Sequence, residues 1–411
     1  VESDAKTRAR IQFAVEQWVA ASSPSNFLAF NAEAQKKAID TQGESITKGM
    51  QNLMHDMRQG HVSMTDESLF EVGKNVATTA GQVVFENEYF QLIEYKPLTA
   101  RVHERPFLLI PPCINKFYIL DLQPENSFIR YCVAQGHRTF VVSWRNPDQS
   151  LAQASWDDYI EHAAIKAIEV TRSISGSDQI NALGFCVGGT ILTNALAVLA
   201  ARKLDWVAST TLLTTLVDFS DTGVLDVFID ENFVRFREMQ FANGGLMAGR
   251  DMAQTFKPGA ATVCGEKVDL SKVKMPFYLY GSREDHIVPI GGAYASTQVF
   301  PGKKRFMMGA SGHIAGVINP PAAKKRSHWV RNDGKFPAIG SPGPKRCLAV
   351  GGPTGPTGSR AMPAKPSPHP RPLARASSRP SSPRQGATSK PRLESHRICL
   401  FFSARSPRRQ P

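Results

Sequence analysis

A cysteine between two glycines is the residue of this chain best placed to do chemistry. Residues 180–185 are an apolar, strand-like run that leads into a Gly-x-Cys-x-Gly pattern centred on Cys186, and residues 190–201, rich in Ala and Leu, predict a helix. A strand, a sharp turn and a helix in this order would lift the cysteine side chain above the edge of a sheet. A cysteine acyl-enzyme is a thioester that can still acylate an alcohol, so the pattern favours acyl transfer over plain hydrolysis.

Two later segments contain the acid and the base that such a nucleophile needs. Asp285 lies in a loop after the strand-like residues 276–280, and His313 ends a loop of small residues after the strand-like residues 305–308. Nucleophile, acid and histidine follow one another in the chain order of an α/β-hydrolase triad. We therefore predict that Cys186, Asp285 and His313 are the catalytic residues.

Each of these three residues has an alternative explanation or a competitor. A buried cysteine is usually a small core residue, but the flanking glycines favour a functional role for Cys186. His286 competes with His313 as the base, although it is expected to face solvent or a neighbouring loop. Glu284 competes with Asp285, which is the shorter acid and heads an Asp-x-x-Val-Pro pattern.

The oxygen that becomes negative during acyl transfer needs two backbone N–H donors. The residue after the nucleophile, Val187, is expected to provide one of them. The loop 111–115 is expected to provide the other, and because its prolines cannot donate, the donor is Ile114 or Cys113, with Ile114 preferred. Cys113 and Asn115 are also predicted to line the substrate pocket.

These side chains need a sheet whose strands end at one common edge. Short apolar runs alternate with helix-like stretches along the chain, which indicates a mostly parallel sheet with helices on both faces. The predicted fold class is α/β, with the α/β-hydrolase fold. The strand-like runs are 83–85, 89–93, 107–110, 139–144, 179–185, 207–216, 276–280 and 305–308.

The sequence divides into three predicted regions. Residues 1–95 are predicted to be a mostly helical amino-terminal region, and residues 96–330 the catalytic domain. Residues 220–262 are irregular and lie where this fold usually inserts a cap, so they are predicted to form a reduced cap. Residues 331–411 are predicted to be a disordered, basic tail rich in Pro, Arg and Ser.

The net charge of +13 comes from the predicted tail. Residues 331–411 hold 16 of the 49 basic residues, 2 of the 36 acidic residues and 15 of the 28 prolines. Such a composition buries too little apolar surface to offset the entropy of ordering. The tail would be either a functional basic segment or an out-of-frame translation, and we favour the second. The remainder of the chain is close to neutral and gives no indication of a nucleic-acid partner.

The six cysteines form no CxxC pair and show no metal-ligand spacing. A sparse, scattered set of this kind fits a reducing cytosol. No apolar run approaches the roughly 20 residues that a membrane helix needs. We therefore expect a cytoplasmic protein with no metal, no cofactor and no membrane span.

Five longer motifs resemble those of class I polyhydroxyalkanoate synthases, and the resemblance covers about residues 1–330. The motifs are residues 111–122, 142–148, 184–189, 280–286 and 312–321. The cysteine of the Pro-Pro-Cys-Ile-Asn motif is similar to that of the short-chain class. By this resemblance Cys186 attacks the thioester of an (R)-3-hydroxyacyl-CoA, typically 3-hydroxybutyryl-CoA, His313 takes the thiol proton, and coenzyme A leaves.

The resemblance also implies how a polymer would grow. The 3-hydroxyl of a second acyl group would attack the enzyme thioester, assisted by Asp285 directly or through His313, and repetition would extend a polyester. Coenzyme A is then a leaving group and not a cofactor. The resemblance further implies association with the surface of a polyester granule and a homodimer.

The chain departs from this family in three places. Its amino-terminal region is shorter, residues 252–259 join two segments that the family separates by several tens of residues, and the sequence after Trp329 no longer matches. The segment missing near 252–259 is the Trp- and Tyr-rich part of the cap. Because a reduced cap would expose apolar surface and admit water to the thioester, a thioesterase-like hydrolase and an inactive granule-bound protein are the alternative functions.

Overall fold

A ten-stranded sheet forms the centre of the computed structural model, with the strand order β1-β2-β4-β3-β5-β6-β9-β10-β11-β12. The structure describes residues 4–60, 62–63, 65–219, 221–228, 231–241, 262–320, 326–331 and 346–348. The strands of this sheet are β1 (Gly81–Glu86), β2 (Phe90–Tyr95), β3 (Phe107–Ile110), β4 (Thr139–Trp144), β5 (Ile180–Phe185), β6 (Val207–Leu213), β9 (Phe277–Ser282), β10 (Lys304–Gly309), β11 (Ser327–Arg331) and β12 (Arg346–Leu348). A separate hairpin consists of β7 (Thr262–Val263) and β8 (Glu266–Lys267).

The six central strands of the sheet, from β4 to β10, run parallel to one another. The outer strands β1, β2, β11 and β12 are antiparallel to their neighbours. All four residues of β3 are buried, as expected for a parallel strand that helices cover on both faces. The prediction of a mostly parallel α/β sheet is confirmed, and the carboxyl ends of its central strands meet at one edge.

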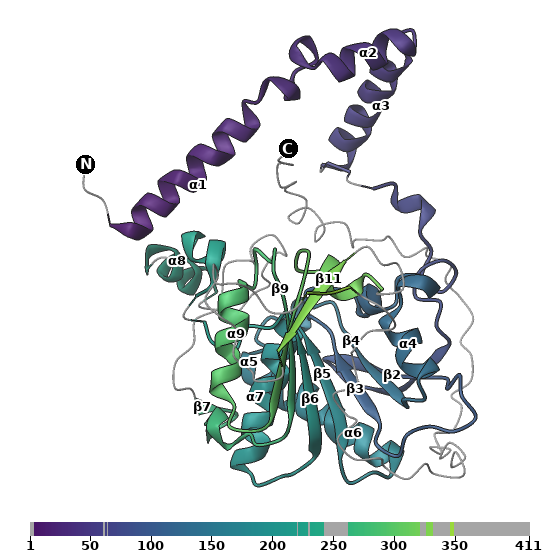
Figure 1. Cartoon of the computed structure of the whole chain (residues 1–411), viewed down its shortest axis with the longest axis vertical. Helices are drawn as coiled ribbons and strands as arrows, with labels where there is room; N and C mark the ends of the chain where they lie inside the picture. The colour runs from purple at the N-terminus through teal and green to yellow at the C-terminus, as the bar shows by residue number, and fades with distance from the viewer. Residues whose placement is uncertain are drawn as a thin grey trace.

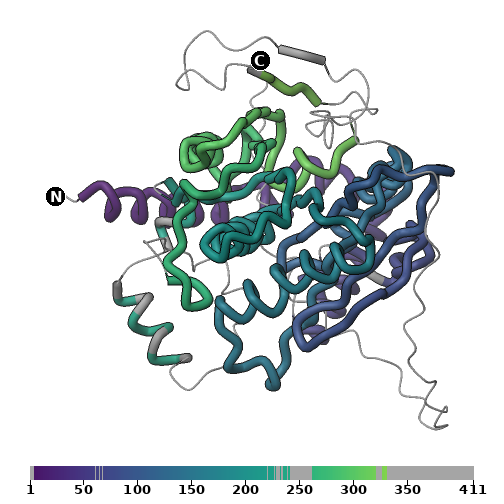
Figure 2. Tube along the Cα trace, turned by 90° about the horizontal axis from the view of Figure 1, so that it is seen from below, coloured from purple at the N-terminus to yellow at the C-terminus, as the bar shows by residue number. Residues whose placement is uncertain are grey.

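Helices cover both faces of this sheet (Figures 1 and 2). Successive side chains of a strand point to opposite faces, so Leu108 and Ile110 belong to one apolar core while Phe107 and Leu109 belong to the other. The first core includes residues of α6, α7 and α9, and the second includes residues of α4. The helices are α4 (Phe128–Ala134), α5 (Trp156–Asp158), α6 (Lys166–Ser175), α7 (Val187–Ala201), α8 (Glu231–Phe241), α9 (Ile290–Val299) and α10 (Ala315–Ile318).

Three amino-terminal helices extend away from the sheet as an arm (Figure 1). They are α1 (Ala5–Ala21), α2 (Ala32–Asp40) and α3 (Glu44–Gln59), and none of them contains a buried residue. Arg10 of α1 donates from Nε to the carbonyl of Val227 at 3.0 Å. Strands β1 and β2 follow this arm but join the sheet through the β2–β4 pair, so the helical region ends before Gly81 and not at residue 95.

Apolar side chains line one face of α3 and are exposed. Their spacing of four, three, one and three residues keeps them on one side of a helix, and we call this set the α3 stripe. Its members are Ile46, Met50, Leu53, Met54 and Met57, with exposed fractions of 45–73%. The packing of the described residues therefore leaves the face without a covering partner.

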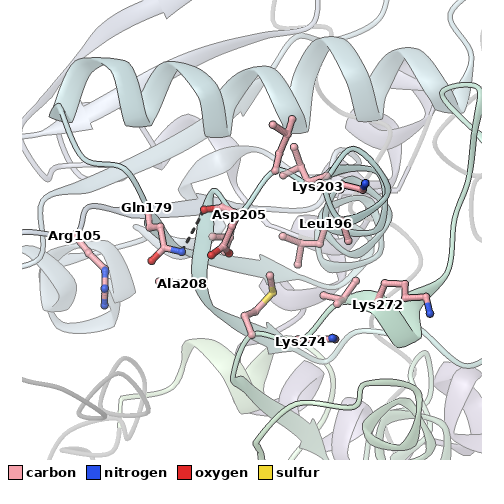
Figure 3. A pocket seen from close by; sticks show the side chains of 14 residues that line it. Arg105, Gln179, Leu196, Lys203, Asp205, Ala208, Lys272 and Lys274 are labelled. Carbon is pink, nitrogen blue, oxygen red and sulfur yellow. Dashed lines mark hydrogen bonds between the residues drawn. The ribbon is translucent and has the colours of Figure 1, made fainter.

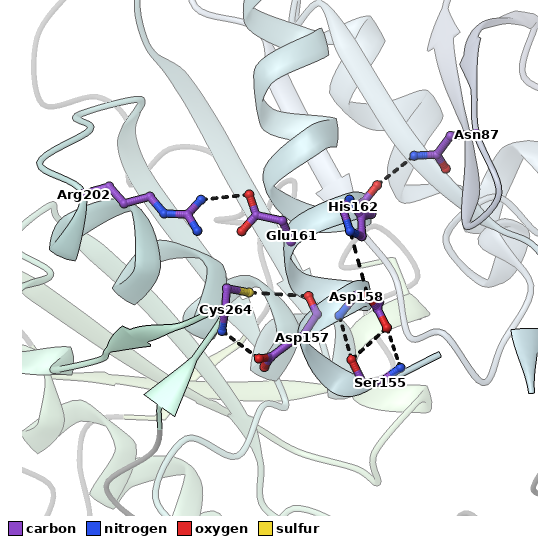
Figure 4. Close-up of polar contacts among 8 residues, drawn as sticks. All are labelled: Asn87, Ser155, Asp157, Asp158, Glu161, His162, Arg202 and Cys264. Atoms are coloured by element: carbon purple, nitrogen blue, oxygen red, sulfur yellow. Dashed lines mark hydrogen bonds and ion pairs between the residues drawn. The ribbon is translucent and has the colours of Figure 1, made fainter. Parts of the chain in front are cut away.

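A hairpin anchors the chain where the described residues resume after the cap region (Figure 4). Cys264, in the turn between β7 and β8, donates from its backbone N–H to Asp157 Oδ2 at 2.9 Å and from its thiol to the Asp157 carbonyl at 3.4 Å. Arg202, next to the end of α7, pairs with Glu161 at 2.8 Å and with Glu266 of β8 at 3.5 Å. These contacts fix the base of the cap region to the helices that cover the sheet.

The described part of the predicted cap consists of a 3₁₀ segment, Gly223–Phe228, and α8. The expected junction at 252–259 lies outside the described residues. In the predicted tail, residues 346–348 form the edge strand β12, which differs from the disorder expected there, and the other residues after 331 lie outside the described set. Within the described residues, no helix is long and apolar enough to cross a membrane.

Candidate active site

Cys186 occupies the sharp turn between β5 and α7. Its backbone has φ 52° and ψ −127°, a conformation that side-chain-bearing residues rarely adopt and that costs free energy. The neighbouring glycines permit this turn, because a Cβ on Gly184 would collide with Gly189 and a Cβ on Gly188 would collide with the carbonyl of Ile110. The turn therefore holds a half-buried thiol at the carboxyl end of β5.

Asp285 and His313 form a buried hydrogen-bonded pair. His313 Nδ1 donates to Asp285 Oδ2 at 2.7 Å, and the exposed fractions of the two residues are 6% and 7%. The other carboxylate oxygen, Oδ1, accepts from the backbone N–H groups of Ile287 and Val288 at 2.9 and 2.8 Å. These three hydrogen bonds leave the carboxylate little freedom, so it holds the imidazole ring in one orientation.

Cys186 and Asp285 together raise the pKa of His313 above its ordinary value of 6.5, to about 10. Burial alone would lower this pKa, but the negative field of the Cys186 sulfur and the hydrogen bond to Asp285 outweigh burial. The ring of Phe185 lies nearly parallel to the imidazole, with 5.9 Å between their centroids. A positively charged imidazole that faces a sulfur is the arrangement by which a histidine activates a cysteine nucleophile.

The side chains of the two competitors point elsewhere. His286 and Glu284 are both exposed, and the backbone N–H of Glu284 donates to the carbonyl of Ser311 at 3.0 Å. Cys186 follows β5, Asp285 follows β9 and His313 follows β10, so the three predicted residues meet at the carboxyl edge of the parallel sheet.

The loop 111–115, which follows β3, lies directly against the turn that carries the cysteine. Gly188 packs on the carbonyl group of Pro111 so closely that no side chain would fit between them. Trp144, the last residue of β4, donates from Nε1 to the same carbonyl at 2.7 Å. The loop is therefore held from both sides. The sequence analysis did not assign Trp144 this function, although the residue belongs to the motif 142–148.

The predicted oxyanion donors lie on these two touching segments. Val187 opens α7, where the first N–H groups of a helix have no partner within the helix. In the loop, the N–H of Asn115 donates to the carbonyl of Pro112 at 3.1 Å. The N–H of Ile114 donates to no acceptor among the described residues, so it remains free to meet an oxyanion.

Cys113 has a protonated thiol in the wall of the site. Burial, with a smaller contribution from nearby Cys186, raises the pKa of Cys113 to about 12. A thiol with such a pKa is neutral at physiological pH and a poor nucleophile. Asn115 in the same loop is half-buried, and among the described residues its side chain makes no hydrogen bond with the other site residues.

Tyr280 is a second positioning residue that the sequence did not single out. Its hydroxyl donates to the carbonyl of Gly316 at 2.8 Å, which joins β9 to the short helix α10 that follows His313. A Cβ on Gly309 or Gly316 would collide with this hydroxyl. The loops that carry Asp285 and His313 are therefore packed against one another through one tyrosine.

The fold and the site define an α/β-hydrolase-fold protein with a cysteine at the nucleophile position. In agreement, residues 106–256 match the alpha/beta hydrolase fold family, and residues 1–132 match the family described as the poly-beta-hydroxybutyrate polymerase (PhaC) N-terminus.

Two curated relatives identify the family. The chain is 54% identical over 394 residues to the poly(3-hydroxyalkanoate) polymerase subunit PhaC of Cupriavidus necator, which covers 81% of this chain and 67% of that protein. It is 34% identical over 386 residues to the subunit of the same name from Rhizobium meliloti, which covers 79% and 63%. The chain therefore belongs to the class I polyhydroxyalkanoate synthases, an acyltransferase family, and spans about two thirds of the length of these relatives.

The match to the Cupriavidus protein also contains an internal gap. Of the 411 residues of this chain, 81% is about 333 residues, whereas the match extends over 394 positions. About 60 positions of the relative therefore have no counterpart in this chain. This size agrees with the several tens of residues expected to be missing near 252–259.

Proposed function

We propose that the chain polymerises (R)-3-hydroxyacyl-CoA, with 3-hydroxybutyryl-CoA as the expected substrate, into polyhydroxyalkanoate and releases coenzyme A. The observation that carries this proposal is the buried Asp285–His313 pair facing Cys186 in a chain of the synthase family. No further cofactor enters the scheme, because coenzyme A is the leaving group of the substrate.

In the first half-reaction, the thiolate of Cys186 attacks the carbonyl carbon of the substrate thioester. The carbonyl oxygen becomes negative and accepts hydrogen bonds from the N–H groups of Val187 and Ile114. The bond to the coenzyme A sulfur then breaks, and that sulfur takes the proton that His313 holds. One thioester replaces another, so this step is close to even in free energy.

In the second half-reaction, the 3-hydroxyl of another acyl group attacks the enzyme thioester. His313, now neutral, removes the hydroxyl proton as the ester bond forms and the bond to the Cys186 sulfur breaks. The geometry favours a function of Asp285 through His313 and not directly on the hydroxyl, because both of its oxygens already accept hydrogen bonds. Thioester to ester is downhill, which drives chain growth.

We further propose that the protein works as a homodimer at the surface of a polyester granule in the cytoplasm. The α3 stripe and the exposed apolar residues of α1 support the granule contact, because these side chains are exposed and a polyester surface would cover them. The residues of α1 are Ile11, Val15, Trp18 and Val19, with exposed fractions of 52–70%.

Incubation of the full chain with 3-hydroxybutyryl-CoA tests the proposed function. Free coenzyme A together with a solvent-extractable polyester is expected. Coenzyme A with only monomeric 3-hydroxybutyrate would indicate a thioesterase, and no thiol release would indicate an inactive granule-bound protein. The thioesterase is the second candidate because about 60 positions of the Cupriavidus relative have no counterpart in this chain, and a smaller cap would admit water to the thioester.

A matched pair of cysteine variants tests the nucleophile. Cys186→Ala is expected to abolish thiol release, whereas Cys264→Ala keeps the backbone hydrogen bond to Asp157 and is expected to retain most of the activity. Turnover by Cys186→Ala above the background rate would refute the mechanism.

A further inference from the structure

A cavity of about 550 Å³ lies at the amino ends of the parallel strands, at the edge of the sheet opposite Cys186. The carboxyl-terminal half of α7, the starts of β5 and β6 and the segment before β9 enclose it (Figure 3). Because Cys186 precedes the first residue of α7 and the cavity adjoins its last turns, the 15-residue helix separates the two sites by about 20 Å. The cavity is therefore distinct from the site described above.

Four cationic side chains and one carboxylate line this cavity. Arg105 lies on one side of the cavity and Lys203, Lys272 and Lys274 on the other, with Asp205 between them (Figure 3). Among the described residues, only Lys272 of these four has an acidic partner, at 3.9 Å and on the exposed surface. A cavity lined mainly by one sign of charge concentrates the opposite sign.

The carboxyl end of α7 explains only part of this charge. Helix carbonyls attract a nearby cation, and Lys203 lies just beyond the last turn of α7. Arg105 precedes β3, and Lys272 and Lys274 precede β9, so these three cations come from segments other than α7. The accumulation at one cavity also contrasts with a chain whose basic excess lies mainly in residues 331–411.

The floor of the cavity is apolar. Ala200, Leu204, Ala208 and Met275 line it and are half-buried, and the buried Leu196 and Val207 lie beneath them. Small-molecule sites commonly combine such a floor with a few charged groups at the rim, at volumes of about 300–1,000 Å³.

We propose that this cavity binds an amphipathic organic anion, with a hydrocarbon body on the apolar floor and a terminal phosphate or carboxylate near Lys203, Lys272 and Lys274. The anion would place negative charge beside these three lysines, and its hydrocarbon part would cover the floor. The proposal is independent of the reaction at Cys186, because the two sites lie at opposite edges of the sheet.

Calorimetric titration of the full chain with octyl phosphate, octanoate, inorganic phosphate and octanol tests this proposal. One saturable site is expected for an amphipathic anion, at least tenfold tighter than for inorganic phosphate or for the neutral alcohol. The tighter of the two amphipathic probes identifies the headgroup. Equal binding of inorganic phosphate would show that the floor contributes nothing, and equal binding of octanol would show that the cations contribute nothing; either result refutes the proposal.

Two variants place the binding in the cavity. Lys203→Gln combined with Lys274→Gln is expected to weaken it at least tenfold, whereas Lys36→Gln combined with Lys37→Gln, the same charge change on α2, is expected to leave it unchanged. Ala208→Phe fills the cavity without changing charge and is also expected to weaken binding at least tenfold. Undiminished affinity in a folded Ala208→Phe variant, judged by circular dichroism, would overturn the assignment.

Discussion

Asp285 and His313 together determine the charge that lies beside the Cys186 sulfur. The carboxylate is held by two backbone N–H groups and by one imidazole nitrogen, so its negative charge is fixed beside the ring. The ring in turn faces the Cys186 sulfur, and the pKa of His313 rises to about 10 because both negative groups outweigh burial. The positive charge of His313 beside Cys186 therefore depends in part on Asp285.

Replacement of Asp285 by Asn tests this dependence. The change removes a group that raises the pKa of His313, so that pKa is expected to fall, and kcat is expected to fall by about 10²–10⁴. The His313 resonance in an NMR titration and the pH dependence of kcat measure the two effects. Glu284→Gln, the same chemical change on the exposed neighbour, is expected to leave both unchanged, and an unaltered His313 titration in Asp285→Asn would contradict the argument.

The raised pKa of His313 also has a consequence for stability. A group whose pKa is higher in the folded state stabilises the fold fully below its unfolded pKa, here near 6.5, and this contribution is lost as the pH rises through about 10. Asp285→Asn is expected to lower the pKa of folded His313, so the stabilising contribution of this residue is expected to be lost at a lower pH. Urea unfolding midpoints between pH 6 and pH 10 measure the difference.

At the scale of elements, the turn before β4 buries a second histidine, whose pKa is lowered and not raised. His137 is 8% exposed, and its ring lies 4.7 Å from that of His103 and 5.6 Å from that of Phe107. Burial, and to a smaller extent His103, lowers the pKa of His137 to about 4. This histidine therefore enters the folded state in its neutral form.

Acid is expected to destabilise the protein in part through His137. Because the unfolded residue binds a proton near pH 6.5 and the folded one only near pH 4, the contribution is complete above pH 6.5 and is lost as the pH falls, by up to about 3 kcal/mol. His137→Phe is expected to flatten the fall in unfolding free energy between pH 6.5 and pH 4. His55→Phe, on the exposed surface of α3, is the control and is expected to keep the wild-type slope.

The arm of α1–α3 contributes surface and not core. Its exposed apolar side chains cost solubility unless something covers them, and the α3 stripe presents them on one face. Leu53→Gln combined with Met57→Gln is expected to weaken partition onto polyester particles at least tenfold, since burial of a side chain of this size is worth about 1.5–3 kcal/mol.

Two substitutions on the opposite face of α3 provide the control for this prediction. Asn52→Gln and His55→Gln keep the stripe intact and are expected to leave partition unchanged, as measured by sedimentation of the particles. Equal loss in both double variants would mean that the stripe does not contact the particle surface.

For the whole molecule, the proposed mechanism depends on keeping water away from the acyl-enzyme. About 60 positions of the Cupriavidus relative have no counterpart here, and under the proposed mechanism any water that enters the site would hydrolyse the acyl-enzyme in place of chain growth. We expect this chain to release more monomeric 3-hydroxybutyrate per coenzyme A than that relative does under the same conditions. Chromatography of both products measures the ratio, and equal ratios would show that the gap leaves the site shielded.

Local rules were enough to predict the sharp turn at Cys186 from the sequence. The Cys186 turn has no space for side chains at Gly184 and Gly188, so its geometry requires the Gly-x-Cys-x-Gly pattern. The chain order of Cys186, Asp285 and His313 predicted that the three residues lie close together, because each follows a strand and the carboxyl ends of parallel strands lie at one edge of the sheet. The fold class followed from the same alternation of apolar runs and helices.

Only the tertiary structure decided which side chains face one another. The sequence favoured Asp285 over Glu284 and His313 over His286 from local patterns alone, whereas packing determines the directions in which neighbours in a loop point. It also did not indicate the burial of His137, the cationic cavity at the amino ends of β5 and β6 or the strand at residues 346–348. Each of these depends on contacts between residues far apart in the chain, and such contacts leave no local pattern in the sequence.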